Sequence, residues 1–149
     1  MKVTIQKTTE IREDEIIIQY HKMTPELANI LNFLSIRNTK LTGINEYDQK
    51  ILFTPHEVFY FESVDGVLYA YLKNEVYRIK EKLEDIISQY KPFGVIRCSR
   101  TMAVNLYLIE RLKSEPGGRI LATLQNGEQI IISRKYAGIL RNELRNGRS

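Results

Sequence analysis

The sequence has few of the residues from which covalent or metal cross-links are made. It contains one cysteine, Cys98, and only two histidines, His21 and His56, which are far apart in the chain. A single cysteine cannot form an internal disulfide, and this spacing of Cys and His fits no zinc site. The composition therefore excludes a disulfide scaffold and is consistent with a reducing compartment. We expect neither a metal nor another cofactor, and no small-molecule substrate.

Long apolar segments are also missing. The first ten residues, MKVTIQKTTE, lack the apolar stretch of an export signal, and uninterrupted apolar runs elsewhere are only a few residues long. We therefore expect a soluble, cytoplasmic protein. A chain of 149 residues suits one domain, or one domain with a small appendage.

Charge is distributed unevenly along the chain. Residues 1–90 contain 11 Lys and Arg against 14 Asp and Glu, whereas residues 91–149 contain 11 against 4. The two parts thus carry −3 and +7, which sum to the overall +4. A positive excess concentrated in one segment is typical of a surface that binds a polyanion, although a solvated basic face is the simpler explanation.

The first forty residues predict a strand–helix extension. Lys2–Gln6 and Glu15–Tyr20 have strand character, the latter because Ile16-Ile17-Ile18 is β-branched. Thr24 as N-cap and Pro25 in the first turn then predict a helix, with one apolar stripe formed by Leu27, Ile30, Leu31 and Leu34. The polar joint Arg37–Thr42 is the best candidate boundary, which divides the chain into residues 1–40 and 41–149.

Short strands dominate the rest of the sequence, so the predicted fold class is mainly β with α. The expected strands are Leu41–Glu46, Lys50–Thr54, Val58–Ser63, Val67–Leu72, Glu75–Arg78, Val95–Cys98, Ala103–Val104 and Leu106–Lys113. A helix is expected over about Lys80–Tyr90.

The last third of the chain predicts a hairpin followed by a helix. Arg119–Gln125 and Glu128–Ser133 flank Asn126-Gly127, a pair that favours a two-residue type I′ turn. The final helix is expected over about Arg134–Leu144.

Two basic segments depart from the residue patterns usual for a helix start and for a strand. Arg134 and Lys135 follow the N-cap Ser133 in the first turn of a helix, where the positive end of the dipole disfavours cations by roughly 0.3–1 kcal/mol. A bound phosphate would compensate, and so would exposure of both side chains to water. The second segment, Arg97-Cys98-Ser99-Arg100-Thr101, interrupts strand alternation with two arginines.

The residue types in these segments suit a nucleic acid. The planar fork of Arg matches O6 and N7 of guanine in the major groove, and Ser and Thr suit phosphate oxygens. Structural roles are expected for two neighbouring residues. Cys98 is expected to be a small core residue, and Asn105 to form hydrogen bonds with backbone groups in a turn. Half-buried strand positions are expected for Tyr60, Tyr69, Tyr71 and Tyr77.

Three blocks in order resemble the LytTR (LytR/AlgR-type) DNA-binding domain of bacterial response regulators. They are VFYFESVDGVLYAYLKNEVYRIKEKLEDI, FGVIRCSRTMAVNLYLIERL and NGEQIIISRKYAGIL, and the match covers roughly Leu41–Leu144. The resemblance implies an elongated stack of small, mostly antiparallel sheets with flanking helices. It also implies that loops and the start of the last helix read successive major grooves of double-stranded DNA.

Carried over residue by residue, the resemblance implies two base readers, Arg100 and Arg134. It implies phosphate or loop contacts at Asp65, Gly66, Arg97, Ser99, Thr101, Ser133, Lys135 and Tyr136. The family often has His where this chain has Ser99, and the loop at Asp65-Gly66 has no basic side chain.

The forty residues before the domain are too few for the receiver domain of family response regulators. The chain therefore resembles a stand-alone LytTR regulator, for which a small membrane protein is a possible controlling partner. The resemblance further implies a homodimer on paired promoter repeats. Residues 1–40 could serve for dimerisation, for that partner, or simply to cover one end of the sheets.

Two other classes of function compete with a transcription regulator. A metal-dependent nuclease needs clustered carboxylates, but the basic part offers only the scattered Glu110, Glu115, Glu128 and Glu143. We therefore do not expect an enzyme. The alternative is a protein-interaction module whose basic face binds an acidic partner or an anionic membrane surface.

Overall fold

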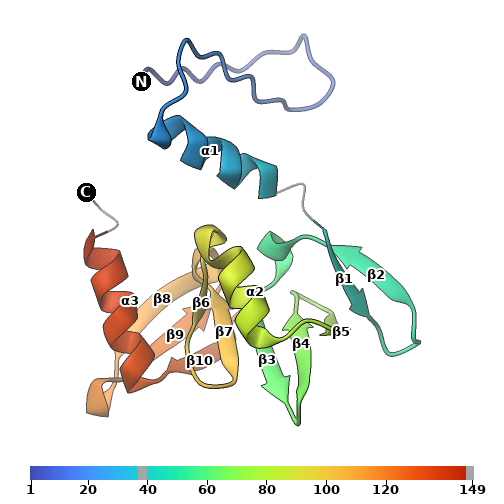
Figure 1. Ribbon diagram of the computed structural model, residues 1–149, viewed down its shortest axis with the longest axis vertical. Coiled ribbons are helices and arrows are strands. Elements are labelled where there is room, and N and C mark those ends of the chain that lie inside the picture. The colour runs from blue at the N-terminus through green and yellow to red at the C-terminus, as the bar shows by residue number, and fades with distance from the viewer. Residues whose placement is uncertain (37–39, 147–149) are drawn as a thin grey trace.

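The computed structural model describes residues 1–36 and 40–146, and two antiparallel sheets form most of it (Figure 1). The larger sheet has the strand order β2-β1-β5-β4-β3-β7-β6 and the smaller one β10-β9-β8. The strands are β1 Leu41–Ile44, β2 Lys50–Phe53, β3 Tyr60–Val64, β4 Val67–Tyr71, β5 Val76–Ile79, β6 Val95–Arg97, β7 Met102–Asn105, β8 Ile109–Ser114, β9 Ile120–Leu124 and β10 Gln129–Ile132. The predicted fold class is confirmed.

Three α-helices lie within the described residues: α1 Pro25–Ile36, α2 Leu83–Tyr90 and α3 Arg134–Asn146. Short 3₁₀ turns are η1 Pro55–Glu57, η2 Lys91–Phe93, η3 Leu106–Leu108 and η4 Pro116–Gly118. The predicted cap of α1 is confirmed, because the Leu27 N–H donates to Thr24 Oγ1 at 3.1 Å. The helix α2 begins at Leu83 rather than near Lys80.

Two hydrophobic clusters hold the sheets and helices together. The first packs α2 against the larger sheet and includes Phe61, Leu68, Ile79, Ile86, Tyr90 and Ala103. The second packs α3 and the smaller sheet together and includes Cys98, Val104, Leu124, Ile132, Ala137 and Leu140. Adjacent residues of β7 point to opposite faces, so Ala103 enters the first cluster and Val104 the second. The loop between β6 and β7 is therefore fixed at the seam of both cores.

The two strands predicted in the N-terminal segment are wrong. Lys2–Gln6 and Glu15–Tyr20 form no strand, and Ile5, Ile16 and Ile17 are 93%, 73% and 73% exposed. A β-branched run favours extended backbone, but a strand exists only when a neighbouring strand accepts its hydrogen bonds. Among the described residues, no strand pairs with this segment.

Two turns differ from their predicted form. At Asn126-Gly127 only Gly127 has positive φ, at 88°, and the Leu124 N–H donates to the Glu128 carbonyl oxygen across a three-residue loop. The predicted type I′ turn is therefore wrong there, although the hairpin itself is confirmed. Predicted strand residues 106–108 instead form η3, because the Tyr107 N–H donates to Oδ1 of Asn105 at 3.1 Å.

The N-terminal helix lies at one end of the molecule, away from the tip of the β3–β4 hairpin (Figure 1). It contacts the domain through Phe33, whose ring meets that of Tyr107 edge-on with centroids 6.1 Å apart. Part of the predicted boundary, residues 37–39, lies outside the described residues, and β1 begins at Leu41.

Candidate nucleic-acid interface

Two backbone hydrogen bonds bring together three turns that are far apart in the sequence. The Ser63 N–H, at the end of β3, donates to the Thr101 carbonyl oxygen at 2.8 Å. The Ser133 N–H, just before α3, donates to the Cys98 carbonyl oxygen, also at 2.8 Å. The loop Cys98–Met102, called the central loop below, is thereby flanked by the β3–β4 turn and by the start of α3. All three predicted contact segments therefore lie along one edge of the molecule.

The β3–β4 turn is a two-residue hairpin loop. Asp65 and Gly66 both have positive φ, 52° and 80°, and Val64 pairs with Val67 across the turn. These angles are typical of a type I′ turn, whose twist matches that of the flanking strands. Both residues are exposed. The turn thus presents backbone groups and one carboxylate, but no cation, to this edge.

The central loop is closed by short hydrogen bonds. The N–H groups of Cys98 and Ser99 both donate to the Met102 carbonyl oxygen, at 2.9 and 3.2 Å. Ser99 Oγ accepts from the Thr101 N–H at 3.3 Å. Arg100 and Thr101 are exposed at the tip. The loop therefore presents the Arg100 guanidinium outward from a closed backbone turn.

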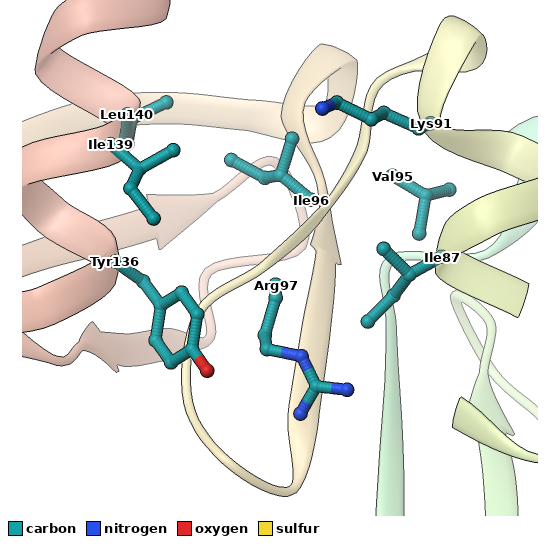
Figure 2. Close-up of a pocket in the computed structure, with 8 residues that line it drawn as sticks. All are labelled: Ile87, Lys91, Val95, Ile96, Arg97, Tyr136, Ile139 and Leu140. Carbon is teal, nitrogen blue, oxygen red and sulfur yellow. The ribbon is translucent and has the colours of Figure 1, made fainter. Parts of the chain in front are cut away.

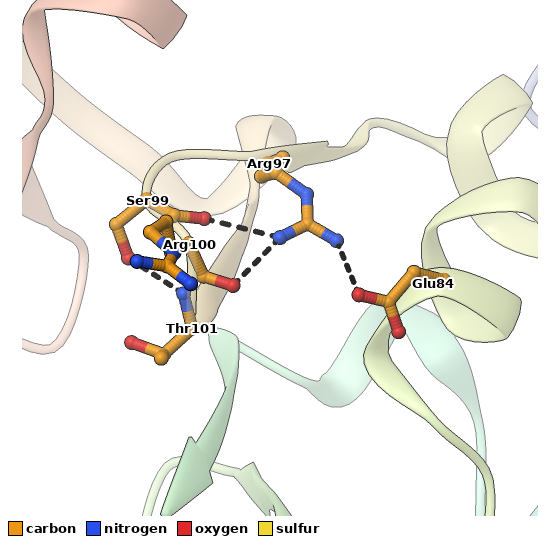
Figure 3. A network of polar contacts seen from close by, with 5 residues as sticks. All are labelled: Glu84, Arg97, Ser99, Arg100 and Thr101. Carbon is orange, nitrogen blue, oxygen red and sulfur yellow. Dashed lines mark hydrogen bonds and ion pairs between the residues drawn. The ribbon is translucent and has the colours of Figure 1, made fainter.

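Arg97 differs from Arg100 in being bound within the protein. It donates to Oε1 of Glu84 at 3.0 Å and to the Arg100 carbonyl oxygen at 2.7 Å (Figure 3). The pKa of the Glu84 carboxyl lies below its usual value, first because of a hydrogen bond from its own backbone N–H and then because of Arg97. A direct phosphate contact by Arg97, as the resemblance implies, would compete with these bonds.

Cys98 is a core residue, as predicted. Its side chain is fully buried, and burial raises the pKa of the thiol to about 12. A thiol with so high a pKa is not a nucleophile at neutral pH. Asn105 is likewise structural, since it is 2% exposed and its Nδ2 donates to the Val58 carbonyl oxygen at 3.1 Å. The predicted structural roles of both residues are confirmed.

The first turn of α3 keeps its cations, and it contains no acidic residue. The Ala137 N–H donates to the Ser133 carbonyl oxygen at 2.7 Å, which places Ser133 at the N-cap position as predicted. Arg134 and Lys135 are exposed, and the Lys135 ammonium lies 5.4 Å from the centroid of the partly buried Tyr136 ring. Dipole and side-chain charge therefore act in the same direction and favour an anion.

The η4 turn adds two arginines that the sequence analysis did not single out. Arg119 Nε donates to the Pro116 carbonyl oxygen at 3.3 Å, and Arg141 Nη1 to the Gly118 carbonyl oxygen at 3.3 Å. A Cβ on Gly118 would lie 3.2 Å from Cγ of Arg134, so that side chain passes directly over the glycine. The sequence signal that could have revealed Arg141 is its seven-residue spacing from Arg134, which puts both on one face of the helix.

Ion pairing leaves the predicted base readers available. Among the described side chains, ion pairs join Arg78 to Asp48 at 3.8 Å and Arg97 to Glu84 at 3.0 Å. Neither involves Arg100 or Arg134. Desolvating an unpaired guanidinium against a base or a phosphate does not require an existing salt bridge to be broken first.

The tyrosines on the larger sheet are buried or partly buried rather than standing free. Tyr60 stacks on Tyr71 with ring centroids 4.3 Å apart, and burial is the main cause that raises the pKa of Tyr60. Tyr69 is also partly buried, and Tyr77 is buried at 9% exposure. Their predicted packing role is confirmed.

Comparison with known proteins agrees with this arrangement. The family model described as "LytTr DNA-binding domain" matches residues 48–145. The chain belongs to the LytTR family of DNA-binding domains. A solved LytTr DNA-binding domain from Bacillus cereus has the same fold, with a TM-score of 0.67 and 24% identity over 71% of this chain and 96% of that one. The LytTR assignment made from three sequence blocks is thus confirmed.

Relatives of similar length extend over the N-terminal residues as well. Uncharacterized HTH-type transcriptional regulators of Staphylococcus aureus strains MSSA476 and NCTC 8325 / PS 47 are each 26% identical over 145 residues, which is 97% of this chain and 98% of each relative. In the described part of this LytTR protein, α2 and α3 are separated by the five strands β6–β10 and so do not form a consecutive helix-turn-helix pair.

Two further properties of the described residues bear on other functions. They contain no group of three or more His, Cys, Asp or Glu side chains placed to hold a metal ion. None of their helices combines the length and the apolar character needed to cross a membrane.

Proposed function

We propose that this LytTR protein is a sequence-specific transcription regulator that binds double-stranded DNA along the edge formed by its three turns. The observation that carries the proposal is the pair of backbone hydrogen bonds from Ser63 and Ser133 to the central loop. These bonds hold two exposed arginines, Arg100 and Arg134, on neighbouring segments. The Staphylococcus aureus relatives carry the name of transcriptional regulators, which supports the same function.

Within this proposal Arg100 and Arg134 read bases, and their neighbours bind the sugar-phosphate backbone. An exposed arginine on a rigid support can present both donors of its fork to guanine O6 and N7. Ser99, Thr101, Ser133, Lys135 and Tyr136 lie beside the two arginines and supply hydroxyl, ammonium and helix-end donors for phosphates. Asp65 and Gly66 approach DNA through backbone groups, and Arg119 and Arg141 extend the positive charge toward η4.

The N-terminal extension, residues 1–40, is proposed to contact a second copy or a membrane-protein partner rather than DNA. Its position supports this role, because α1 and the N-terminal segment lie at the end away from the β3–β4 tip (Figure 1). Sedimentation of the full chain against an Ile16→Asp, Ile17→Asp variant tests self-association. A dimer that survives both substitutions would contradict dimerisation through this segment.

Selection of duplexes from a random library by the full-length protein provides the test. The selected duplex should bind in about 150 mM salt in the presence of excess random competitor, because purely electrostatic binding is lost there. Arg100→Ala and Arg134→Ala should each cost about 1–3 kcal/mol and relax base preference locally. Lys135→Ala should weaken all sequences alike and reduce the salt slope by about 1.

Arg12→Ala is the matched control, since Arg12 is an exposed arginine of the N-terminal segment. It should leave both affinity and base preference unchanged. Equal losses on selected and random duplex for Arg100, Arg134 and Lys135 would contradict the proposed division of roles. Recovery of no sequence, together with binding to anionic vesicles, would favour the interaction-module alternative.

A further inference from the structure

We propose that Arg97 is a positioning residue that fixes the backbone on which Arg100 reads DNA, an inference that rests on the DNA-binding function proposed above. The Arg97 guanidinium has three partners inside the protein. Nη1 donates to the carbonyl oxygens of Arg100 and Ser99, at 2.7 and 3.4 Å, and Nη2 donates to Oε1 of Glu84 at 3.0 Å (Figure 3).

The two carbonyl groups belong to the peptide units on either side of the Arg100 Cα. A peptide unit is planar, so fixing the direction of its carbonyl fixes the whole unit. When both flanking units are fixed, φ and ψ of Arg100 are fixed as well, and so is the direction of its Cα–Cβ bond. One guanidinium therefore determines where the Arg100 side chain leaves the backbone.

The same contacts remove an electrostatic conflict. Carbonyl oxygens carry partial negative charge, and two of them at the tip of the central loop would repel an approaching phosphate. Arg97 turns the Ser99 and Arg100 carbonyls toward itself. The Arg100 side chain is then exposed at this tip.

Glu84 and the surrounding apolar residues anchor the Arg97 side chain. Glu84 lies in the first turn of α2, so its carboxylate connects the loop to a helix that packs on the larger sheet. Figure 2 shows Arg97 between Ile87 of α2 and Tyr136 of α3, in a groove of about 220 Å³ lined mainly by apolar groups. Its side chain is only 20% exposed, compared with 72% for Glu84.

A positioning role and a direct phosphate contact predict different responses to lysine. A lysine keeps the positive charge and could still meet a phosphate, but it lacks the planar fork through which Arg97 reaches its three acceptors. Loss of positioning should lower affinity for the selected duplex alone. Loss of a phosphate contact should lower affinity for every duplex and reduce the salt slope.

The test measures dissociation constants for the selected duplex and for a random duplex over a range of salt concentrations. Arg97→Lys should lower the ratio of the two affinities by roughly tenfold, with random-duplex affinity and salt slope unchanged. Glu84→Gln should lower the ratio by a smaller factor while strengthening random-duplex binding, because a negative charge is removed. Arg78→Lys, in the exposed pair with Asp48, is the control and should leave the ratio unchanged.

The ratio is insensitive to partial unfolding, which reduces both affinities by the same factor. The inference is overturned if Arg97→Lys retains the wild-type ratio of the two affinities. This holds whether Arg97→Ala then weakens binding to both duplexes equally or to neither. If the wild-type protein does not distinguish the two duplexes, the proposed function itself fails, and that outcome is separate from the first.

Discussion

The edge that carries the three turns and the N-terminal segment differ in opposite ways from what their local sequences favour. The segment contains the β-branched run Ile16-Ile17-Ile18 but forms no strand, whereas the central loop contains small polar and charged residues and is closed on all sides by hydrogen bonds. The difference lies in the partners. The edge gains backbone partners from β3 and from Ser133 just before α3, while no strand among the described residues pairs with the segment. Tertiary hydrogen bonding therefore decides the secondary structure in both places.

Core truncation should produce the largest contrast between the two regions. Phe61 is fully buried in the first cluster, so Phe61→Ala should lower the free energy of unfolding by about 3–5 kcal/mol. Ile17→Ala removes a side chain that is 73% exposed and should change it by less than about 0.5 kcal/mol. Urea unfolding at fixed pH checks both, and a loss above 1 kcal/mol for Ile17→Ala would show that the segment packs on the domain.

Asn105 tests how far the edge depends on buried polar groups. Asn105→Ala leaves the Val58 carbonyl and the Tyr107 N–H without their side-chain partner, since both bonds come from one amide. We expect a loss of about 2–3 kcal/mol in urea unfolding, because unsatisfied buried groups retain their desolvation cost. Unchanged stability would mean that water replaces the amide there.

Much of the domain, but less of the site, could be predicted from the sequence. Alternating strands, the Thr24 cap, the start of α3 and the two basic segments were all predictable from local chemistry. The pairing of Ser133 with Cys98 was not, because it joins residues that are distant in the chain and have no complementary pattern. The difference between a bound Arg97 and an exposed Arg100 was also hidden, since it arises from Glu84 and the loop carbonyls, which the sequence does not place beside Arg97.

Alkaline pH should weaken the edge through Cys98. Its thiol pKa is raised to about 12 in the folded protein from an ordinary 9.0, so the unfolded chain loses the proton first. Stability is thus fully present below pH 9.0 and falls as pH rises toward 12. The free energy of unfolding should drop by about 1–2 kcal/mol between pH 8 and 10, beyond the drop in a Cys98→Ala control.

Substitution of Gly138 should stabilise the protein slightly, in contrast to the destabilising changes above. It lies exposed in α3, and an added Cβ meets nothing within 4 Å. Gly138→Ala should raise the free energy of unfolding by about 0.5–1 kcal/mol, because alanine favours helix more than glycine does. The thermal midpoint should rise slightly as a result. A decrease would reveal a contact on that face.

Site-directed photo-cross-linking to the selected duplex tests most directly whether the three turns form one DNA-binding edge, as proposed. A cysteine-reactive probe is attached to Thr101→Cys, Lys135→Cys and, as control, Glu26→Cys of α1, while the buried Cys98 stays unlabelled. The account predicts cross-links from positions 101 and 135 to neighbouring nucleotides, and none from position 26. Cross-links from position 26 alone, or from 101 and 135 to widely separated stretches of the duplex, would contradict it.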